Sequence, residues 1–232
     1  MLLGAIRDEF VERSWDPPDR HWSGRWATLV GGRDRTAGGT WLAVDPDPAR
    51  PAVAAVLNSV RRDPLPDGAA RPTRGELALR LLAGDGLPAG AELAPYDRFH
   101  LLLATSDRQE LWTWDGDALE HHVLAPGHHI VVNLGLDADA DPMVPHFAPL
   151  LAAVPDPDLD DGWGGWTDLL AGDGLAGDDD RALVVSRLIE GRAYGTTSGA
   201  LVGLARDGRV RYDFTATPDD PTSWAPVAVL PT

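Results

Sequence analysis

The apolar residues of this chain are gathered in short runs, most of them ended by glycine, proline or aspartate. Runs of this length and punctuation are typical of β-strands, because helices need longer periodic segments. Asp115-Gly116 and Asp207-Gly208 lie between such runs and predict tight hairpins, since glycine tolerates the positive φ of hairpin turns. We therefore expect strands, antiparallel around these hairpins, at residues 2–6, 41–44, 52–57, 99–104, 110–114, 121–124, 128–132, 201–205 and 210–214.

Helices are fewer. Thr73 and Glu76 have the spacing of a capping box, in which a hydroxyl and a carboxylate satisfy the free amides at a helix start, and this helix should end near Gly84. Further helices are expected at 145–153 and 163–171, and loops rich in Asp, Gly and Pro at 64–72, 84–95, 155–165 and 172–180. The pattern predicts an α+β protein.

The length of the chain favours a single domain. One core can still grow at 232 residues, so we expect one domain over 1–232. The chain contains no cysteine, which excludes disulfides, thiolate zinc sites and a cysteine nucleophile in the form given. No apolar stretch reaches the length of about 18 residues that a membrane span needs, and the first ten residues lack a basic signal-peptide region. We therefore expect a cytoplasmic protein.

The charge balance limits the partners. The formal net charge is −16, and all 20 basic residues are arginine. Such a surface repels phosphate backbones and anionic lipids. Nucleic acid and membranes are therefore not expected partners.

Two groups of residues have the residue types and spacing of possible metal ligands. Residues 137–141 open like a calcium loop, but proline stands at the sixth position and alanine at the twelfth, so a solvated acidic loop is the better interpretation. There are two histidine doublets, His121-His122 and His128-His129. If they lie on paired strands, each doublet could place one imidazole on a shared face of the sheet. Two imidazoles could bind a transition metal or an iron porphyrin. No third ligand has an obvious place, so we favour ordinary imidazoles on an exposed sheet face and expect no metal.

Other candidate residues are tryptophans and polar groups at strand ends. Trp15, Trp22 and Trp26 belong to a total of nine tryptophans, and they either pack in a core or line a pocket for a flat or apolar ligand. Polar side chains beside glycines or at the ends of strands mark either a site or simple turn chemistry. Those considered are Arg7, Asp8, Arg33, Asn58 and Asn133. Conventional catalytic and phosphate-binding motifs are absent.

Taken in order, several segments resemble the NRDE family, also called the transport and Golgi organisation 2 family. The apolar strand that runs into Arg7-Asp8-Glu9 resembles its naming motif, Asn-Arg-Asp-Glu. Gly-Gly-Arg-Asp at 31–34 with Ala-Gly-Gly-Thr-Trp-Leu at 37–42 is the most specific match. The remaining matches are 73–77, 126–128 with Asn133, and 194–198.

The resemblance implies the N-terminal-nucleophile hydrolase fold, a four-layer αββα sandwich of two antiparallel sheets. By resemblance, a catalytic pocket would contain Arg7, Asp8, Asn58 and Asn133. Family members normally begin with Met-Cys and one further strand, and have Asn where this chain has Ile6. We expect either that the true start lies upstream, with the first strand missing here, or that this member has lost the nucleophile.

The family is implicated in haem trafficking and in lipid homeostasis. The resemblance therefore implies a protein that binds or traffics a hydrophobic metabolite, haem or an acyl lipid, with Trp22, Arg33, Trp41 and His128 as ligand-binding positions. No cofactor is required, and haem is the leading ligand. The alternative is an amidohydrolase that uses an upstream cysteine on a non-peptide C–N bond.

Overall fold

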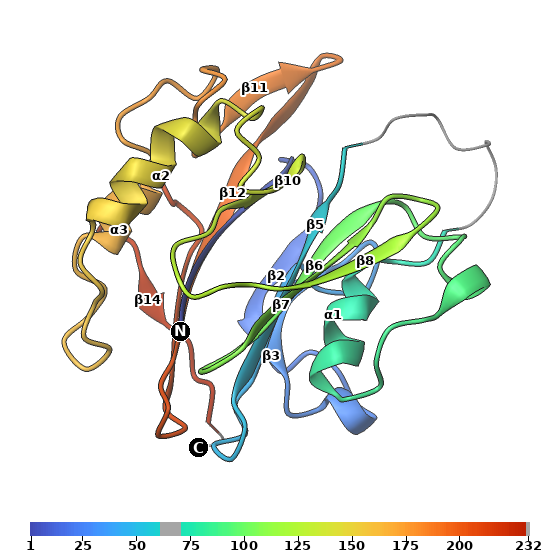
Figure 1. The fold of residues 1–232 in the computed structure, drawn as a ribbon. Coiled ribbons are helices and arrows are strands. Elements are labelled where there is room, and N and C mark those ends of the chain that lie inside the picture. Colours follow the sequence, from blue (N-terminus) through green and yellow to red (C-terminus); the bar gives the residue numbers. More distant parts are fainter. Residues whose placement is uncertain (61–70, 231–232) are drawn as a thin grey trace.

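The computed structural model describes residues 1–60 and 71–230. Two antiparallel sheets pack face to face, with helices on both outer faces (Figure 1). Helices α2 (Met143–Ala153) and α3 (Trp166–Leu170) cover one sheet, and α1 (Gly75–Leu82) covers the other. This arrangement confirms the expected α+β class and the αββα layering. None of the helices in the described ranges is long and apolar enough to cross a membrane.

The first sheet is organised around one long strand, β12, whose thirteen residues pair with three other strands. The strand β1 pairs with it along nine residues, with a register shift between Arg7 and Asp8. The strand order is β1-β12-β13-β14, and β11 also pairs with β12. The bounds are β1 (Leu2–Phe10), β11 (Ser186–Ile189), β12 (Arg192–Leu204), β13 (Val210–Thr215) and β14 (Ala225–Pro226).

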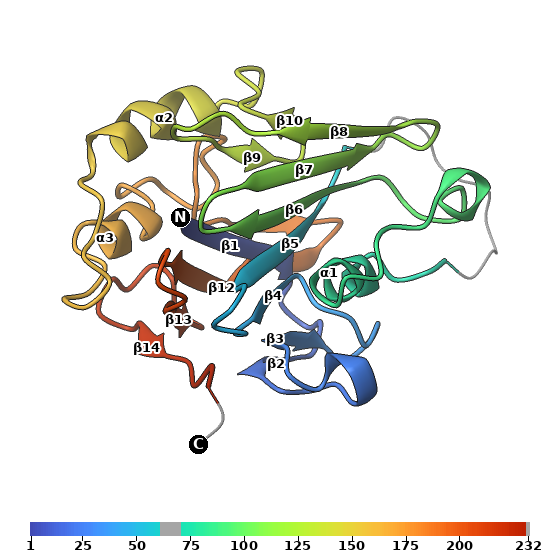
Figure 2. The same cartoon turned by 60° about the horizontal axis from the view of Figure 1, so that its bottom comes forward.

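The second sheet is a seven-stranded meander, because its strands follow one another in chain order from β2 to β8 (Figure 2). The bounds are β2 (Trp15–Asp19), β3 (Val30–Asp34), β4 (Leu42–Asp45), β5 (Ala52–Asn58), β6 (Phe99–Thr105), β7 (Gln109–Trp114) and β8 (Leu119–Val123). A separate small hairpin follows, formed by β9 (Val131–Val132) and β10 (Gly135–Leu136). Two 3₁₀ turns, Gly24–Trp26 and Gly90–Glu92, complete the described elements.

Three apolar clusters fill the spaces between the layers. Side chains such as Val53 and Val202 meet between the two sheets. Leu77 and Phe99 belong to the cluster between α1 and the second sheet. Trp166 packs with Leu2 and Ile6 on the outer face of the first sheet. Both faces of β1 are therefore covered, which explains its unbroken apolar run.

Most of the expected elements are confirmed, including the hairpins at Asp115-Gly116 and Asp207-Gly208. The strand expected at 128–132 was largely wrong, because only Val131–Val132 form a strand there. The sequence reasoning missed β2, β3, β10, β11 and β14. Two prolines in β2 disguised it, and they are tolerated because β2 lies at the edge of its sheet, where a missing N–H costs no ladder bond. Residues 64–70 of one expected loop lie outside the described residues.

The capping box at the start of α1 was also wrong in detail. The Thr73 hydroxyl accepts a hydrogen bond from the Gly75 N–H at 3.2 Å, and not from the amide of Glu76. The Glu76 N–H is instead bonded to the Thr73 carbonyl oxygen, at 3.3 Å. Among the described residues, the Glu76 carboxylate makes no return bond to the helix start. The Glu76 carboxylate is therefore not used in capping the helix.

The start of α1 lies directly against the turn before β4. The Thr40 N–H donates to the Gly75 carbonyl oxygen at 3.3 Å. A Cβ atom at Gly75 would lie 2.5 Å from the Thr40 oxygen, and one at Gly39 would lie 2.7 Å from the Gly75 carbonyl carbon. Only glycine at both positions permits this approach of the two backbones.

We predict that Gly75→Ala lowers the free energy of unfolding by about 1–3 kcal/mol, the usual cost of overpacking, because the new methyl group meets rigid backbone. The measurement is urea unfolding. Gly165→Ala is the matched control: that glycine is exposed, has a helical φ of −71° and leaves ordinary space for a Cβ. Its stability should be unchanged or raised by up to about 1 kcal/mol. Equal stability of both variants would contradict the packing argument.

Candidate functional site

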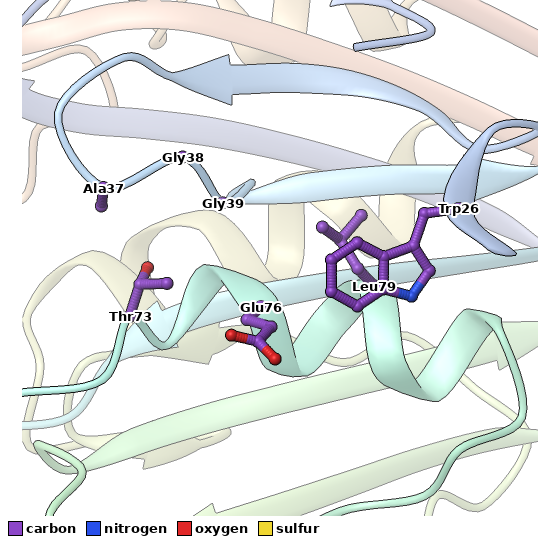
Figure 3. Close-up of a pocket in the computed structure, with 7 residues that line it drawn as sticks. All are labelled: Trp26, Ala37, Gly38, Gly39, Thr73, Glu76 and Leu79. Atoms are coloured by element: carbon purple, nitrogen blue, oxygen red, sulfur yellow. The ribbon is translucent and has the colours of Figure 1, made fainter. Parts of the chain in front are cut away.

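A pocket lies between the turn at Ala37–Gly39 and the first turns of α1 (Figure 3). Its cavity volume is about 150 Å³. The residues that line it come from three separate segments, the 3₁₀ turn at Gly24–Trp26, the turn before β4 and α1. They are Trp26, Ala37, Gly38, Gly39, Thr73, Glu76 and Leu79.

Local hydrogen bonds shape the glycine turn. The Asp34 carboxylate accepts hydrogen bonds from the N–H groups of Thr36 (2.8 Å) and Ala37 (3.0 Å). Gly38 adopts a positive φ of 76°, and its carbonyl oxygen accepts a 3.1 Å bond from the indole N–H of Trp22. The turn is therefore held from both sides, which makes it a fixed wall of the pocket. Trp22, a predicted ligand-binding position, supports this turn through its indole N–H and is not among the residues that line the pocket.

The pocket combines an aromatic ring, an aliphatic side chain and a carboxylate. Figure 3 shows the six-membered ring of Trp26 on the side nearer Glu76 and its indole nitrogen on the opposite side. Leu79 is buried beneath them. The guanidinium carbon of Arg25 lies 5.2 Å from the centre of the Trp26 ring, and Arg25 also pairs with Asp85 at 3.2 Å. These groups offer an apolar contact with one negative charge beside it.

Arg7 is buried between the two sheets. Its guanidinium donates a 2.8 Å hydrogen bond to the Thr197 hydroxyl and stacks on Trp41 at 4.5 Å from the ring centre. Burial lowers the pKa of Arg7, and the carboxylate of Glu9, 3.7 Å away, opposes that shift. Trp41 in turn lies against Gly32, where a Cβ would meet its ring. Arg7 and Trp41 therefore hold the sheets together.

Asp8 faces away from Arg7, toward the helix side of the sheet. The Thr196 hydroxyl donates a 2.6 Å bond to its carboxylate and accepts one from the Val185 N–H at 2.8 Å. Asp8 keeps an exposed side chain. The protein atoms packed around its carboxylate raise the pKa of Asp8, while the Thr196 bond lowers it. Successive residues of a strand point to opposite faces, so Arg7 and Asp8 do not share a pocket.

Asn58 and Asn133 lie at one end of the second sheet. The Asn133 carbonyl oxygen accepts bonds from the Val60 N–H (3.0 Å) and from a ring nitrogen of His100 (3.2 Å). Both Asn residues are exposed. The structure therefore links Asn133 to the segment that follows Asn58, through backbone atoms. His100 was missed by the sequence reasoning, because nothing in a lone histidine on an apolar strand marks it as buried.

Arg33 is engaged in an ion network. Asp16 pairs with Arg33 at 2.7 Å and with Arg35. The hydrogen bonds from Arg35 and then from Arg33 lower the pKa of Asp16 to about 2. Arg33 thereby ties β3 to β2.

The histidine doublets do not lie on paired strands. His121 and His122 belong to β8, which pairs with β7, whereas His128 and His129 precede β9. His121 stacks on Trp112, with ring centres 4.6 Å apart. His128 is exposed. In residues 1–60 and 71–230, no group of three or more His, Asp or Glu side chains could hold a metal ion.

The loop around Asp137 is held by a local pair. His129 contacts the Asp137 carboxylate through Nδ1 at 2.7 Å and the Ala125 carbonyl oxygen through Nε2 at 2.9 Å. Both ring nitrogens thus face acceptors, an environment that suits the doubly protonated ring. The bond to Asp137 is the main reason that the pKa of His129 is raised, and burial opposes it.

Comparison with known protein families gives a match over the first part of the chain. A family model described as Transport and Golgi organisation 2 matches residues 1–151 of the 232. The matched range contains β1 to β10, both walls of the pocket and most of α2. No curated protein matches the chain.

We predict that Asp137→Asn lowers the pKa of His129 toward its usual value of about 6.5, measured by NMR titration of the ring. Asparagine accepts the positive φ of 46° at this position. Because the folded-state pKa of His129 is raised, its stabilising contribution is complete below the unfolded pKa and is lost as pH rises through the folded one. The stability advantage of the wild type over Asp137→Asn should therefore shrink with rising pH. Asp139→Asn, an exposed change two residues on, should leave the titration of His129 unaltered.

Proposed function

Because the chain belongs to the transport and Golgi organisation 2 family, we propose that it binds a hydrophobic metabolite in the pocket between the Ala37–Gly39 turn and α1. One observation carries this proposal. Two segments that resemble family signatures, 37–42 and 73–77, form the walls of one pocket and touch through Gly39 and Gly75. Trp26, which also packs against the core cluster between α1 and the second sheet, supplies an aromatic ring to the same pocket.

The size of the pocket favours an acyl chain over haem. A cavity of about 150 Å³ holds roughly a benzene-sized group, so it accepts the end of an alkyl chain and not a porphyrin. His128, the axial ligand that haem binding would need, is exposed and is not among the pocket residues. The ligand proposed is therefore an acyl lipid or a similar chain, carried by a cytoplasmic protein.

Hydrolysis of an amide by an N-terminal cysteine is the weaker proposal. Arg7 and Asp8 lie on opposite faces of β1, and Arg7 is occupied by Thr197 and Trp41. The 232 residues contain no cysteine that could act as the nucleophile.

We predict saturable binding of 1-dodecanol, measured by titration calorimetry, and a loss of roughly tenfold or more in affinity with Trp26→Ala. A buried tryptophan contact contributes about 1.5–3 kcal/mol, and 1.4 kcal/mol corresponds to tenfold. Trp22→Ala should weaken binding less, because it removes only the bond that holds Gly38.

Trp112→Ala is the control, since this ring lies on β7 and is not among the pocket residues. Haemin is the second probe. Saturable haemin binding that His128→Ala abolishes would replace the acyl chain by haem as the ligand. If neither 1-dodecanol nor haemin bound up to its solubility limit, the proposed function would be overturned.

A further inference from the structure

The carboxylate of Glu76 is the acidic group of the pocket. Among the described residues, no arginine or histidine comes within ion-pair distance of it. Arg80, one turn further along α1, donates to the Gly86 carbonyl oxygen at 3.4 Å. Arg25, whose guanidinium stacks on Trp26, is paired with Asp85. Both guanidinium groups therefore have partners other than Glu76.

The helix itself stabilises a negative charge at this position, since Glu76 lies in the first turn of α1. A carboxylate at the rim of a small pocket rejects anions and attracts cations, and the formal charge of −16 adds to that preference. The helix start therefore does not serve here as an anion site.

Trp26 completes the surroundings that a cationic group requires. An indole ring attracts a cation through its negatively charged face, and tryptophan is the strongest of the aromatic residues in this respect. The stacking of Arg25 at 5.2 Å shows that this ring already takes part in such an interaction. Carboxylate, indole and Leu79 together match a small, bulky, weakly hydrated cation that carries apolar substituents.

We propose that the pocket selects a ligand whose head is a methylated ammonium group, held by the Glu76 carboxylate and the Trp26 ring. This inference rests on the proposed function, because it concerns the same pocket, and it assigns the cavity to the cationic head of the ligand in place of the end of its chain. It excludes ligands that would place a carboxylate or a phosphate there, free fatty acids included.

Three probes of nearly equal shape separate charge from size: choline, its neutral carbon isostere 3,3-dimethyl-1-butanol, and the anion 3,3-dimethylbutyrate. Binding is followed through the indole N–H resonance of Trp26 in ¹H–¹⁵N spectra, assigned with Trp26→Phe. We expect choline to bind about tenfold more tightly than the neutral isostere, and the anion to bind most weakly. Glu76→Gln should bring the affinity for choline down to that of the isostere and leave the isostere unchanged.

Glu120→Gln, an exposed change on β8, is the matched control and should keep the preference. Equal affinities for the three probes, or a preference for choline that survives Glu76→Gln, would overturn the inference. Binding of the neutral probe would in that case still support the proposed function. If no probe moved the Trp26 resonance and 1-dodecanol also failed to bind, the inference and the proposed function would both fall.

Discussion

The backbone contact between Gly39 and Gly75 determines where α1 lies on the seven-stranded sheet. Without side chains at these positions, the turn before β4 and the start of the helix approach until Thr40 donates to Gly75. The buried face of α1 can then pack on β5 and β6, and its first turn is brought under the glycine turn. The pocket is a by-product of this contact, because its two walls are the two segments that the contact joins.

Buried charges in this molecule are compensated in two ways. Inside, Arg7 lies between the sheets with a hydroxyl, an indole face and a nearby carboxylate as neighbours, so a buried cation is compensated by several weak partners. Elsewhere, largely buried carboxylates such as Asp16 and Asp34 pair with arginines from neighbouring segments. The Glu76 carboxylate is one of many in the described ranges that make no ion pair, and it differs from the others in lining the pocket where a ligand is proposed.

Much of the fold followed from local patterns. Short apolar runs placed most strands, and the two Asp-Gly pairs placed hairpins, because turn geometry depends on the residues of the turn itself. Local patterns failed where tertiary neighbours determine the structure. The segment β2 is a strand despite its two prolines, because it lies at the edge of its sheet. Residues 128–130 do not form a strand, although apolar residues follow them. The candidate site was predicted in part. The glycine segments were singled out, but Trp26 and Glu76 were not recognised as residues that line one pocket.

The sequence by itself determined the class of the protein, its family resemblance, the positions of its tight turns and the glycines that permit close backbone approach, since these depend on residue type and spacing. Only the tertiary structure decided which side chains meet. Arg7 reaches Thr197 across 190 positions of sequence, whereas its neighbour Asp8 turns to the opposite face. Trp26 and Glu76 become neighbours because α1 packs where Gly75 allows it. Contacts between side chains that are far apart in the sequence depend on strand pairing and on the packing of the layers, which local sequence patterns do not determine.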